Sequence, residues 1–443
     1  MAGSRKAVPG AVGSWGAAGS ARIAVVGAGY VGLTTAVCLA HLGHEVVCTD
    51  LDAARVALLN RGELPIVEAG LGELLAETLQ LGSLCFTDDV VAAVPAAEVV
   101  YLCVQTPQRS DGSADLSYVQ AAARQIAKHL KPGAIVVNKS TVPVGSTKVV
   151  ERELSRPDVF VVSNPEFLRE GSAVRDFFQP DRIVVGSDSP EVTKRVAYLY
   201  RGLDAPAIIT TPATAETIKY ASNAFLATKI SFINAMAAVC EAVGADVSDV
   251  AVGMGYDRRI GVDCLVPGPG WGGSCFPKDT HALIQIAEEA GYDFHLLRGA
   301  VEVNNAQRRR VVRKIIAAAG GSVRDKRVAV WGLTFKAGTD DLRESPAVSV
   351  AHALRDHGAT IVAYDPTTIG KDVDGVTTVG DPFLACADAS VLAILTEWPE
   401  FRCLDLGRVA VALANPAVVD ARNILDRDRA RGAGLTYVGI GRA

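Results

Sequence analysis

Residues 22–32 have the sequence RIAVVGAGYVG, and this stretch decides the fold. The apolar run before Gly27 is typical of a buried parallel strand, and a helical pattern follows the glycines as far as Leu42. Gly27, Gly29 and Gly32 match GxGxxG, in which the first glycine permits a tight turn, the second admits a pyrophosphate and the third allows close helix packing. The stretch therefore predicts the opening of a dinucleotide-binding βαβ unit.

An acidic residue ends the next predicted strand. That strand covers residues 45–49, and Asp50 lies 18 residues beyond Gly32. A carboxylate at this position accepts hydrogen bonds from ribose hydroxyls and repels a 2′-phosphate, so we expect NAD rather than NADP as the cofactor. Tyr30 and Val31, at the start of the helix, are expected to contact it too. The alternative is a glycine turn that merely packs the strand against the helix.

The remaining pattern predicts an α/β fold with two Rossmann-like doubly wound domains, joined by a long central helix and a small helical middle domain. Residues 21–210 form the NAD-binding domain, with further strands at 98–104, 134–137, 159–162 and 182–185. Residues 211–322 form the middle domain, which opens with a long helix from Ala213 and continues with helices near 280–289 and 307–319.

Residues 323–443 are expected to form the second Rossmann-like domain. They repeat the opening plan of strand, turn, helix, strand and terminal acid without its glycine signature. Strands are predicted at 327–332, 360–365, 389–395, 409–413 and 418–423, with a helix at 347–357. Residues 1–20 are small and glycine-rich, and a flexible tail is expected there.

Composition excludes several classes of protein. The 443 residues include 44 basic and 49 acidic side chains, a net charge of −5 that gives no footprint for a nucleic-acid backbone. No run of about 18 apolar residues is free of charges, so no membrane span is expected. Nine cysteines without a CxxC pair favour a reducing, cytoplasmic setting. The seven histidines form no HxH or HExxH spacing, so no metal is expected.

The segment GPGWGGSCFPKD, residues 268–279, is the most specific of the chain. Its thiol, Cys275, lies between loop-forming residues with Lys278 and Asp279 close behind, so it is expected to line a cleft where a cation or a helix N-terminus activates it. An inert, packed cysteine is the alternative.

Two pairs of polar residues at helical spacing are further candidates. Lys219 and Asn223 lie one turn apart on the long helix and could hold a developing oxyanion; a solvated pair on an exposed face is the alternative. Glu166 and Glu170 could serve as a base and a water ligand, or simply form a charged first helical turn. Thr106, which precedes Pro107 after a predicted strand, could contact the cofactor or end that strand in an ordinary turn.

Seven segments in order resemble the UDP-glucose/GDP-mannose dehydrogenase family of nucleotide-sugar 6-dehydrogenases. They are GAGYVG, KSTVPVGST, SNPEFLREG, AETIKYASNAF, DRRIG, GPGWGGSCFPKD and FKAGTDDLRESP. The resemblance runs from about residue 21 to the end. It implies a homodimer or higher homo-oligomer that oxidises a sugar C6 alcohol to a carboxylate with NAD, through a thiohemiacetal and a thioester on Cys275.

The resemblance also implies roles for individual residues. It makes Lys219 and Asn223 the oxyanion holders and Asp279 an aid to proton transfer, while Thr141 and Glu170 position water. Cofactor contacts are implied for Thr106, Pro107, Thr141, Glu170, Lys278 and Arg343. Substrate contacts are implied for Glu166, Phe167, Leu168, Arg169, Lys219, Asn223, Gly272, Cys275, Phe335 and Lys336, and across subunits for Arg259. Surface salt bridges are the alternative for Arg259 and Arg343.

The substrate is expected to be a nucleotide-activated glucose. UDP-glucose is the first choice, dTDP-glucose the second, and GDP-mannose is less favoured. The loop carries Ser274 and Cys275 where the N-acetylmannosamine branch has HCIPVD, which disfavours a 2-acetamido sugar. Trp271 stands where many relatives have Phe or Tyr, a departure in packing. Two rivals are a two-electron β-hydroxyacid-type dehydrogenase, which has no use for the thiol, and a non-catalytic nucleotide-sugar sensor.

Overall fold

The first part of the chain folds around an eight-stranded sheet. A computed structural model describes residues 19–109 and 112–442, so most of the expected N-terminal tail lies outside the described residues. The chain divides into two compact units, one ending at Ser222 and the other beginning at Asn223. The strands of the first unit are β1 (Arg22–Val26), β2 (Glu45–Thr49), β3 (Leu84–Thr87), β4 (Val99–Leu102), β5 (Ile135–Asn138), β6 (Phe160–Ser163), β7 (Ile183–Gly186) and β8 (Ala207–Thr210).

These strands lie in the order β3-β2-β1-β4-β5-β6-β7-β8. All neighbours pair in parallel except β6 and β7, which meet antiparallel at Ser163 and Gly186. Most of the strands are apolar on both sides, as expected for strands covered by helices on both faces. The prediction of a doubly wound domain is confirmed.

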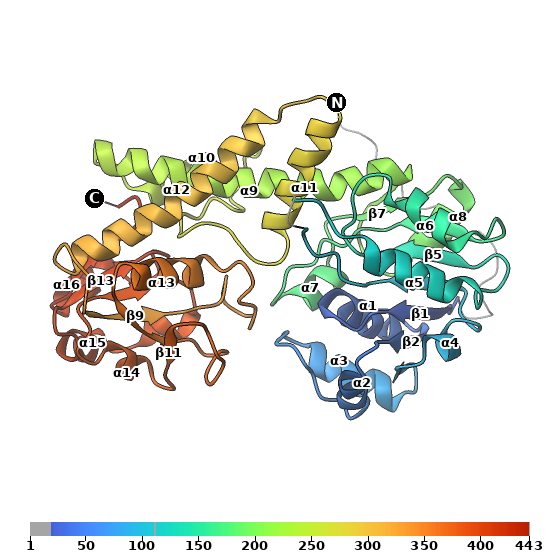
Figure 1. The fold of residues 1–443 in the computed structure, drawn as a ribbon, viewed down its shortest axis with the longest axis horizontal. Coiled ribbons are helices and arrows are strands. Elements are labelled where there is room, and N and C mark those ends of the chain that lie inside the picture. The colour runs from blue at the N-terminus through green and yellow to red at the C-terminus, as the bar shows by residue number, and fades with distance from the viewer. Residues whose placement is uncertain (1–18, 110–111, 443) are drawn as a thin grey trace. The chain divides into compact units, whose positions relative to one another are not determined.

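Helices cover both faces of this sheet (Figure 1). The helices are α1 (Tyr30–His41), α2 (Ala53–Asn60), α3 (Leu71–Gln80), α4 (Val90–Ala93), α5 (Ser117–Ala127), α6 (Ser146–Leu154), α7 (Ala173–Phe178) and α8 (Pro190–Tyr198). Helices α1, α2, α3, α7 and α8 pack on one face, and α4, α5 and α6 on the other. Asp52 and Asp89 begin α2 and α4 by accepting hydrogen bonds from first-turn N–H groups.

The second unit contains a six-stranded sheet with the order β11-β10-β9-β12-β13-β14, all parallel. Its strands are β9 (Arg327–Trp331), β10 (Thr360–Tyr364), β11 (Val376–Thr378), β12 (Leu392–Ile394), β13 (Ala417–Asp420) and β14 (Thr436–Val438). In chain order this repeats the arrangement of the first six strands of the first sheet. The prediction of a second Rossmann-like domain is therefore confirmed.

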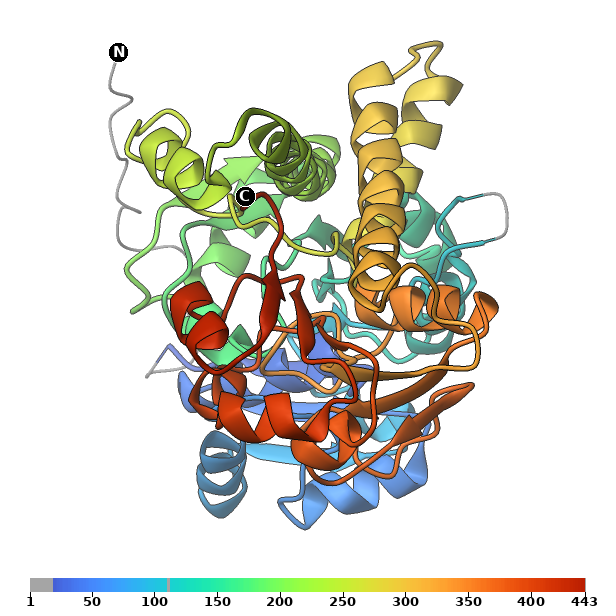
Figure 2. The same ribbon diagram turned by 90° about the vertical axis from the view of Figure 1, so that its left-hand side faces the viewer.

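The helices of the second unit are α10 (Val247–Gly255), α11 (Phe276–Glu289), α12 (His295–Ala318), α13 (Pro346–Asp356), α14 (Pro382–Cys386), α15 (Leu406–Ala412) and α16 (Arg427–Gly432), with a short 3₁₀ helix at Pro399–Cys403. Helices α11 and α12 pack side by side as a hairpin (Figures 1 and 2). Helices α12 and α13 cover one face of the sheet, and α14 and α15 the other.

One predicted strand is wrong. Residues 409–413 belong to α15, in which Asp405 accepts hydrogen bonds from Gly407 N and Arg408 N and so starts a helix. A short apolar run does not distinguish a buried strand from a buried helix, and the capping aspartate decides between them here.

The long predicted helix is α9 (Pro212–Val243), which begins in the first unit and ends in the second. Within residues 19–109 and 112–442, it alone is long and apolar enough, by length and composition, to cross a membrane. The core helix of a protein that spans no membrane passes the same test. Its first turns carry Glu216, Lys219 and Asn223, all buried.

Candidate active site

The turn after β1 leaves space where a pyrophosphate binds in folds of this kind. Gly27 has a φ of +100°, and a Cβ there would lie 2.7 Å from the carbonyl oxygen of Cys103. A Cβ on Gly32 would lie 1.8 Å from the carbonyl oxygen of Gly27, so only glycine lets α1 pack on the turn. A Cβ on Gly29 would meet nothing within 4 Å. That open side, at the N-terminus of α1 where Tyr30 and Val31 stand, fits the phosphates of NAD.

Asp50, which directly follows β2, stabilises this turn through hydrogen bonds. Its Oδ2 accepts a hydrogen bond from Ala28 N at 2.8 Å and lies 3.3 Å from a guanidinium nitrogen of Arg55. Its Oδ1 accepts from Asp52 N at 3.0 Å. The side chain keeps 14% of its surface exposed. A carboxylate held this way can accept hydrogen bonds from a ribose without moving.

Thr106 and Thr141 join the loops that follow two neighbouring strands. Thr106 follows β4 and Thr141 follows β5, and the Thr106 hydroxyl donates to the Thr141 carbonyl at 2.9 Å. Both threonines are buried, and Pro107 comes next at the same edge. The structure thus brings these predicted residues to the carboxyl edge of the sheet, where ligands bind in open α/β folds.

Glu166 and Lys219 form a buried ion pair. Their Oε1 and Nζ atoms lie 2.8 Å apart, and each side chain is about one-twentieth exposed, at 5% and 4%. Glu166 Oε2 also accepts from Leu168 N at 2.7 Å. Burial alone would raise the pKa of Glu166, but the charge and hydrogen bond of Lys219, the Leu168 N–H and the charge of Lys139 together lower it. The pair therefore holds a carboxylate and an ammonium inside the fold.

Two alternatives from the sequence are wrong. Lys219 and Asn223 do not lie on a solvated face, because they are 3% and 6% exposed. Glu166 and Glu170 do not form a charged first helical turn, since α7 begins only at Ala173 and both stand in the loop before it. Glu170 is half-buried there.

The loop with Glu166 and Glu170 is fastened to the start of α1. Glu68, which is 6% exposed, accepts from Gly171 N at 2.7 Å and is hydrogen-bonded to the hydroxyl of Tyr30. Within the loop, the Arg182 guanidinium stacks 3.6 Å from the ring centroid of Phe167. Arg169 is held by Asp176 through its Nε at 3.0 Å. Phe167, Leu168 and Arg169 are thus fixed beside the cofactor turn.

In the second unit Cys275 is the N-cap residue of α11. The thiol is partly exposed, and the Ser274 hydroxyl lies 3.6 Å from Sγ. The positive end of the helix dipole favours a thiolate at this position. The structure does not pack this cysteine inside the core, since it is partly exposed.

Asp279 lies one turn after Cys275 and is fully buried. Its Oδ2 accepts from Asn223 Nδ2 at 2.5 Å and its Oδ1 from Lys278 Nζ at 2.7 Å. Asn223 comes from α9, and Asp279 and Lys278 come from α11. The three residues therefore link the long helix to the helix that carries the thiol.

Glycines bring the thiol loop close to the loops that follow β9. A Cβ on Gly272 would lie 2.0 Å from the Glu344 carbonyl oxygen, and a Cβ on Gly273 would lie 2.8 Å from the Phe335 ring. Lys336, half-buried, follows Phe335. Arg343 is paired with Asp341 at 2.6 Å, and Arg259 with Asp257 at 2.6 Å on the surface of this unit.

Comparison with known proteins matches this chain domain by domain. Three consecutive domain models match: the NAD binding domain at residues 21–204, the central domain at 213–306 and the UDP binding domain at 329–427. The chain belongs to the UDP-glucose/GDP-mannose dehydrogenase family. It is an NAD-dependent dehydrogenase of that family, and the cofactor prediction is confirmed.

Relatives in this family match over nearly the whole chain. A UDP-glucose 6-dehydrogenase of Rhizobium meliloti is 49% identical, covering 95% of this chain and 99% of that protein. One of Bacillus subtilis is 44% identical, with 95% and 93% covered. The solved UDP-glucose dehydrogenase of Pyrobaculum islandicum is similar with a TM-score of 0.88 and 38% identity, covering 97% of this chain and 100% of that chain.

The structure adds residues that the sequence analysis missed. Arg422, in the loop after β13, donates to the carbonyls of Phe335 and Leu395 at 2.9 and 2.8 Å, beside the predicted substrate residues. Glu68 and Lys139 are buried polar groups near Glu166 or its loop. Arg422 had one local signal, its place near the end of the strand predicted at 418–423. The partners of Glu68 and Lys139 are distant in sequence. No cluster of metal-ligating side chains lies among residues 19–109 and 112–442.

Proposed function

We propose that this enzyme oxidises the C6 alcohol of UDP-glucose to the carboxylate of UDP-glucuronate, through a thiohemiacetal and a thioester on Cys275. The observation that carries the proposal is the N-cap position of Cys275 on α11, with buried Asp279 one turn behind it and bonded to both Asn223 and Lys278. A dehydrogenase that stops at the aldehyde or ketone has no use for a thiol in this place.

The first oxidation makes use of the polar groups on α9. Bound NAD accepts a hydride from C6 in each of the two oxidations. Lys219 and Asn223 are spaced one helical turn apart and stabilise the developing oxyanion, an effect of ~3–4 kcal/mol for each preorganised donor. The hydroxyl proton leaves toward Asp279, whose carboxylate accepts from Asn223 and Lys278.

The second oxidation takes place on the sulfur. The Cys275 thiol gives up its proton and its sulfur attacks the aldehyde carbon. A C–S bond forms, and the carbonyl oxygen takes up that proton and becomes the hydroxyl of a thiohemiacetal. Loss of its hydride and proton leaves a thioester. Water then attacks the thioester carbon, the C–S bond breaks, and the acid and the free thiol are released. Thr141 and Glu170 position that water, and Asp279 moves its proton.

Both units contribute residues to NAD binding and to sugar binding. Gly27, Gly29, Tyr30, Val31, Gly32, Asp50, Thr106, Pro107, Lys278 and Arg343 contact NAD in this proposal. Phe167, Leu168, Arg169, Gly272, Phe335 and Lys336 contact the nucleotide sugar. Support comes from the carboxyl edges of the two sheets, at which most of these residues stand, whereas Gly272 and Lys278 belong to the thiol loop and α11.

The test counts NADH formed per sugar consumed with UDP-glucose, dTDP-glucose and GDP-mannose. Two NADH per sugar with UDP-glucose preferred is the expected result. A preference for dTDP-glucose or GDP-mannose would correct the nucleotide. One NADH per sugar would indicate the two-electron β-hydroxyacid type of reaction, and none with any sugar would indicate a sensor.

The proposal includes a homodimer. Apolar side chains line one side of α9 at spacings of seven, seven and four residues, with Phe225, Phe232, Val239 and Val243 between 48% and 71% exposed. Val252 and Tyr256, at and just beyond the end of α10, add 55% and 83% exposed side chains. Arg259, just beyond them, is 89% exposed, and in this proposal it reaches the substrate of a second copy. Light scattering of Phe232→Asp should show loss of the dimer.

Nine free cysteines fit a cytoplasmic setting.

A further inference from the structure

The inner side of α12 is polar although it is buried. Asn304 and Gln307 are 1% and 4% exposed. The carboxamide of Asn304 makes two hydrogen bonds to one residue, because its Oδ1 accepts from Trp271 N at 2.8 Å and its Nδ2 donates to Trp271 O at 3.0 Å. Gln307 Nε2 donates to Gly268 O at 2.8 Å. Buried amides with every bond directed at one loop fix the backbone of that loop.

Helix α9 holds the same loop from another element. Asn234 Oδ1 accepts from Gly268 N at 2.8 Å. The Ser231 hydroxyl accepts from the indole N–H of Trp271 at 2.9 Å and donates to Ala300 O on α12 at 2.7 Å. The Trp271 ring meets the Phe276 ring edge-on, with centroids 6.4 Å apart. Residues 268–271 are therefore fixed by side chains of two helices.

The chain between Trp271 and Cys275 has little freedom. Only Gly272, Gly273 and Ser274 intervene, and the two glycines press against the Glu344 carbonyl and the Phe335 ring. A shift of Trp271 must therefore move either the sulfur or the N-terminus of α11. Asn304 is also tightly fitted at Gly270, where a Cβ would lie 2.6 Å from its Oδ1.

We propose that Asn304 is a positioning residue for the thiol: its paired hydrogen bonds to Trp271 set the place of Cys275 Sγ at the start of α11. The inference rests on the proposed function for the chemical use of that sulfur. Covalent catalysis needs the attacking atom within a fraction of an ångström of its productive position, and a displacement of about 1 Å costs on the order of 100-fold in rate.

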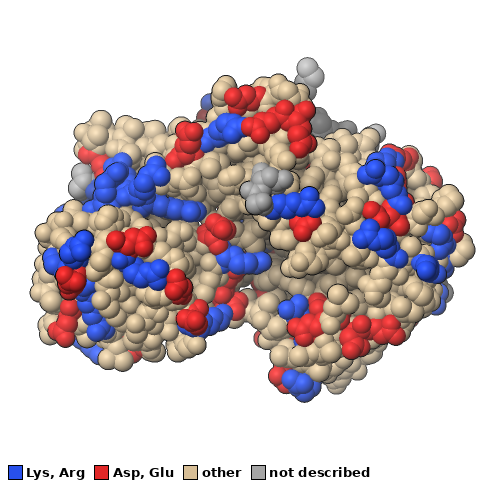
Figure 3. Space-filling model, in the orientation of Figure 1, with Lys and Arg blue, Asp and Glu red and all other residues tan. Residues whose placement is uncertain are grey.

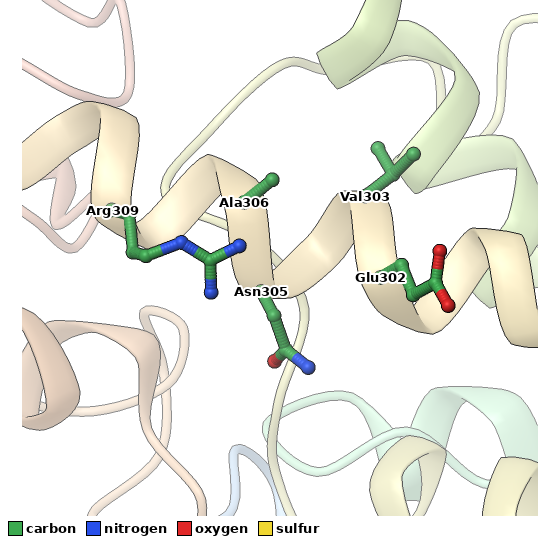
Figure 4. Close-up of a pocket in the computed structure, with 5 residues that line it drawn as sticks. All are labelled: Glu302, Val303, Asn305, Ala306 and Arg309. Atoms are coloured by element: carbon green, nitrogen blue, oxygen red, sulfur yellow. The ribbon is translucent and has the colours of Figure 1, made fainter.

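The outer side of α12 supplies a matched control. Glu302, Asn305 and Arg309 project from one side of the helix and, with Val303 and Ala306, line a hollow of about 520 Å³ (Figure 4). Basic side chains gather over this helix in Figure 3, and Arg309 and Arg313 are exposed. Asn305 is the same residue type as Asn304, adjacent in sequence and exposed. Asn305→Leu therefore repeats the chemical change without touching the loop.

The experiment uses the 6-aldehyde of the nucleotide sugar as the substrate of the full-length enzyme. Oxidation of the aldehyde with NAD needs the thiol, whereas its reduction with NADH, the reverse of the first step, does not. We expect Asn304→Leu to slow oxidation by about 10- to 100-fold and to leave reduction within about 3-fold. Asn305→Leu should leave both rates unchanged. If the leucine variant does not fold, Asn304→Asp replaces it in the experiment. This variant keeps the acceptor for Trp271 N and loses the donor to Trp271 O.

Each contrary outcome has one meaning. If Asn304→Leu slows both reactions equally, or neither, Asn304 does not position the sulfur. If Cys275→Ser abolishes oxidation while Asn304→Leu and Asn304→Asp oxidise at the normal rate, only the positioning proposal is wrong. If Cys275→Ser oxidises the aldehyde normally, the proposed function is wrong, and the role of Asn304 in catalysis falls with it.

Discussion

Asp50 in the first unit and Asp365 in the second stand at the same place in two sheets with the same strand order. Each follows the second strand of its sheet, β2 or β10, and each accepts hydrogen bonds from the turn after the first strand. Asp50 accepts one bond from that turn, from Ala28 N, and stays partly exposed. Asp365 is 1% exposed. One of its oxygens, Oδ2, accepts four hydrogen bonds, from Leu333 N, Thr334 N, the Thr334 hydroxyl and Trp398 Nε1.

The difference teaches how one fold serves two purposes. In the first unit the turn has open space beside Gly29 and an acid with free accepting capacity. In the second unit Asp365 takes up the N–H groups of the equivalent turn. No pyrophosphate can use donors that are already bonded within the protein. The fold is therefore shared, and the free donors and acceptors decide where a dinucleotide binds.

The largest effect that the comparison predicts lies in the second unit. Cys275→Ser should lower the rate of acid formation by ~10³-fold or more, because serine is a much weaker nucleophile toward the aldehyde. The affinity for NAD, whose glycine turn and Asp50 lie in the first unit, should stay within a factor of about 2. Steady-state NADH formation and NAD titration calorimetry measure the two quantities.

Cys403→Ser, at an exposed cysteine of the same unit, is the control and should change neither quantity. Loss of NAD affinity in Cys275→Ser would show that the thiol of the second unit also contributes to NAD binding, and would contradict the contrast between the two units.

The next effect concerns stability. Asp365→Leu should lower the free energy of unfolding by about 3 kcal/mol, because several buried donors lose one common acceptor. Asp50→Leu should lower it by less than about 1 kcal/mol, since water can reach the groups it leaves. Thermal unfolding followed by circular dichroism compares the two variants directly, and equal losses would contradict the contrast drawn between the two acids.

The buried ion pair of the first unit, Glu166 with Lys219, makes the stability of the protein depend on pH. In the native protein the pKa of Glu166 is lowered, so its contribution to stability is present at neutral pH and is lost as the pH falls below the usual range of a glutamate. Lys219→Met removes the partner and leaves burial, which raises that pKa. The variant should lose about 3 kcal/mol at neutral pH, and the loss should shrink as the pH falls and Glu166 takes up a proton.

Urea unfolding of Lys219→Met across this pH range is the measurement. The double variant Lys219→Met with Glu166→Gln has no buried charge at the site and should regain most of the stability at neutral pH. A loss that does not change with pH in the single variant would show that Glu166 is not the group responsible.

The sequence allowed prediction of those parts of the fold and site that depend on neighbouring residues. The strand, glycine turn, helix and Asp50 of the first unit lie within 29 residues, and close contacts explain Gly27 and Gly32. Helix α9 followed from its length and spacing. Residues 409–413 were placed in the wrong element because a short apolar run carries no period, and the capping by Asp405 was not weighed.

The parts that could not be predicted depend on partners far apart in the chain. The buried state of Lys219 comes from Glu166, 53 residues away, and Asn304 meets Trp271 at a separation of 33 residues. A pattern of polar residues cannot tell such pairs from solvated ones. Asn304 and Gln307, on the buried side of an otherwise ordinary helix, had only their spacing of three residues as a signal.

The smallest effect separates the charge of Asp50 from its geometry. Asp50→Asn keeps one of the two accepting oxygens, so the bond from Ala28 N in the turn can be preserved, while the bond from Asp52 N to the other oxygen is lost. We expect the Kd of NAD to rise by about 10-fold, or ~1.4 kcal/mol, because a neutral amide accepts more weakly from the ribose hydroxyls. The Kd of NADP should fall, since the repulsion of the 2′-phosphate is gone. Calorimetric titration with both cofactors measures these shifts, and Asp365→Asn is the matched control, with an NAD affinity that stays within about 2-fold. If both asparagine variants weaken NAD equally, then the acid of the second sheet also serves the cofactor, and the bonds within the protein do not explain its different use.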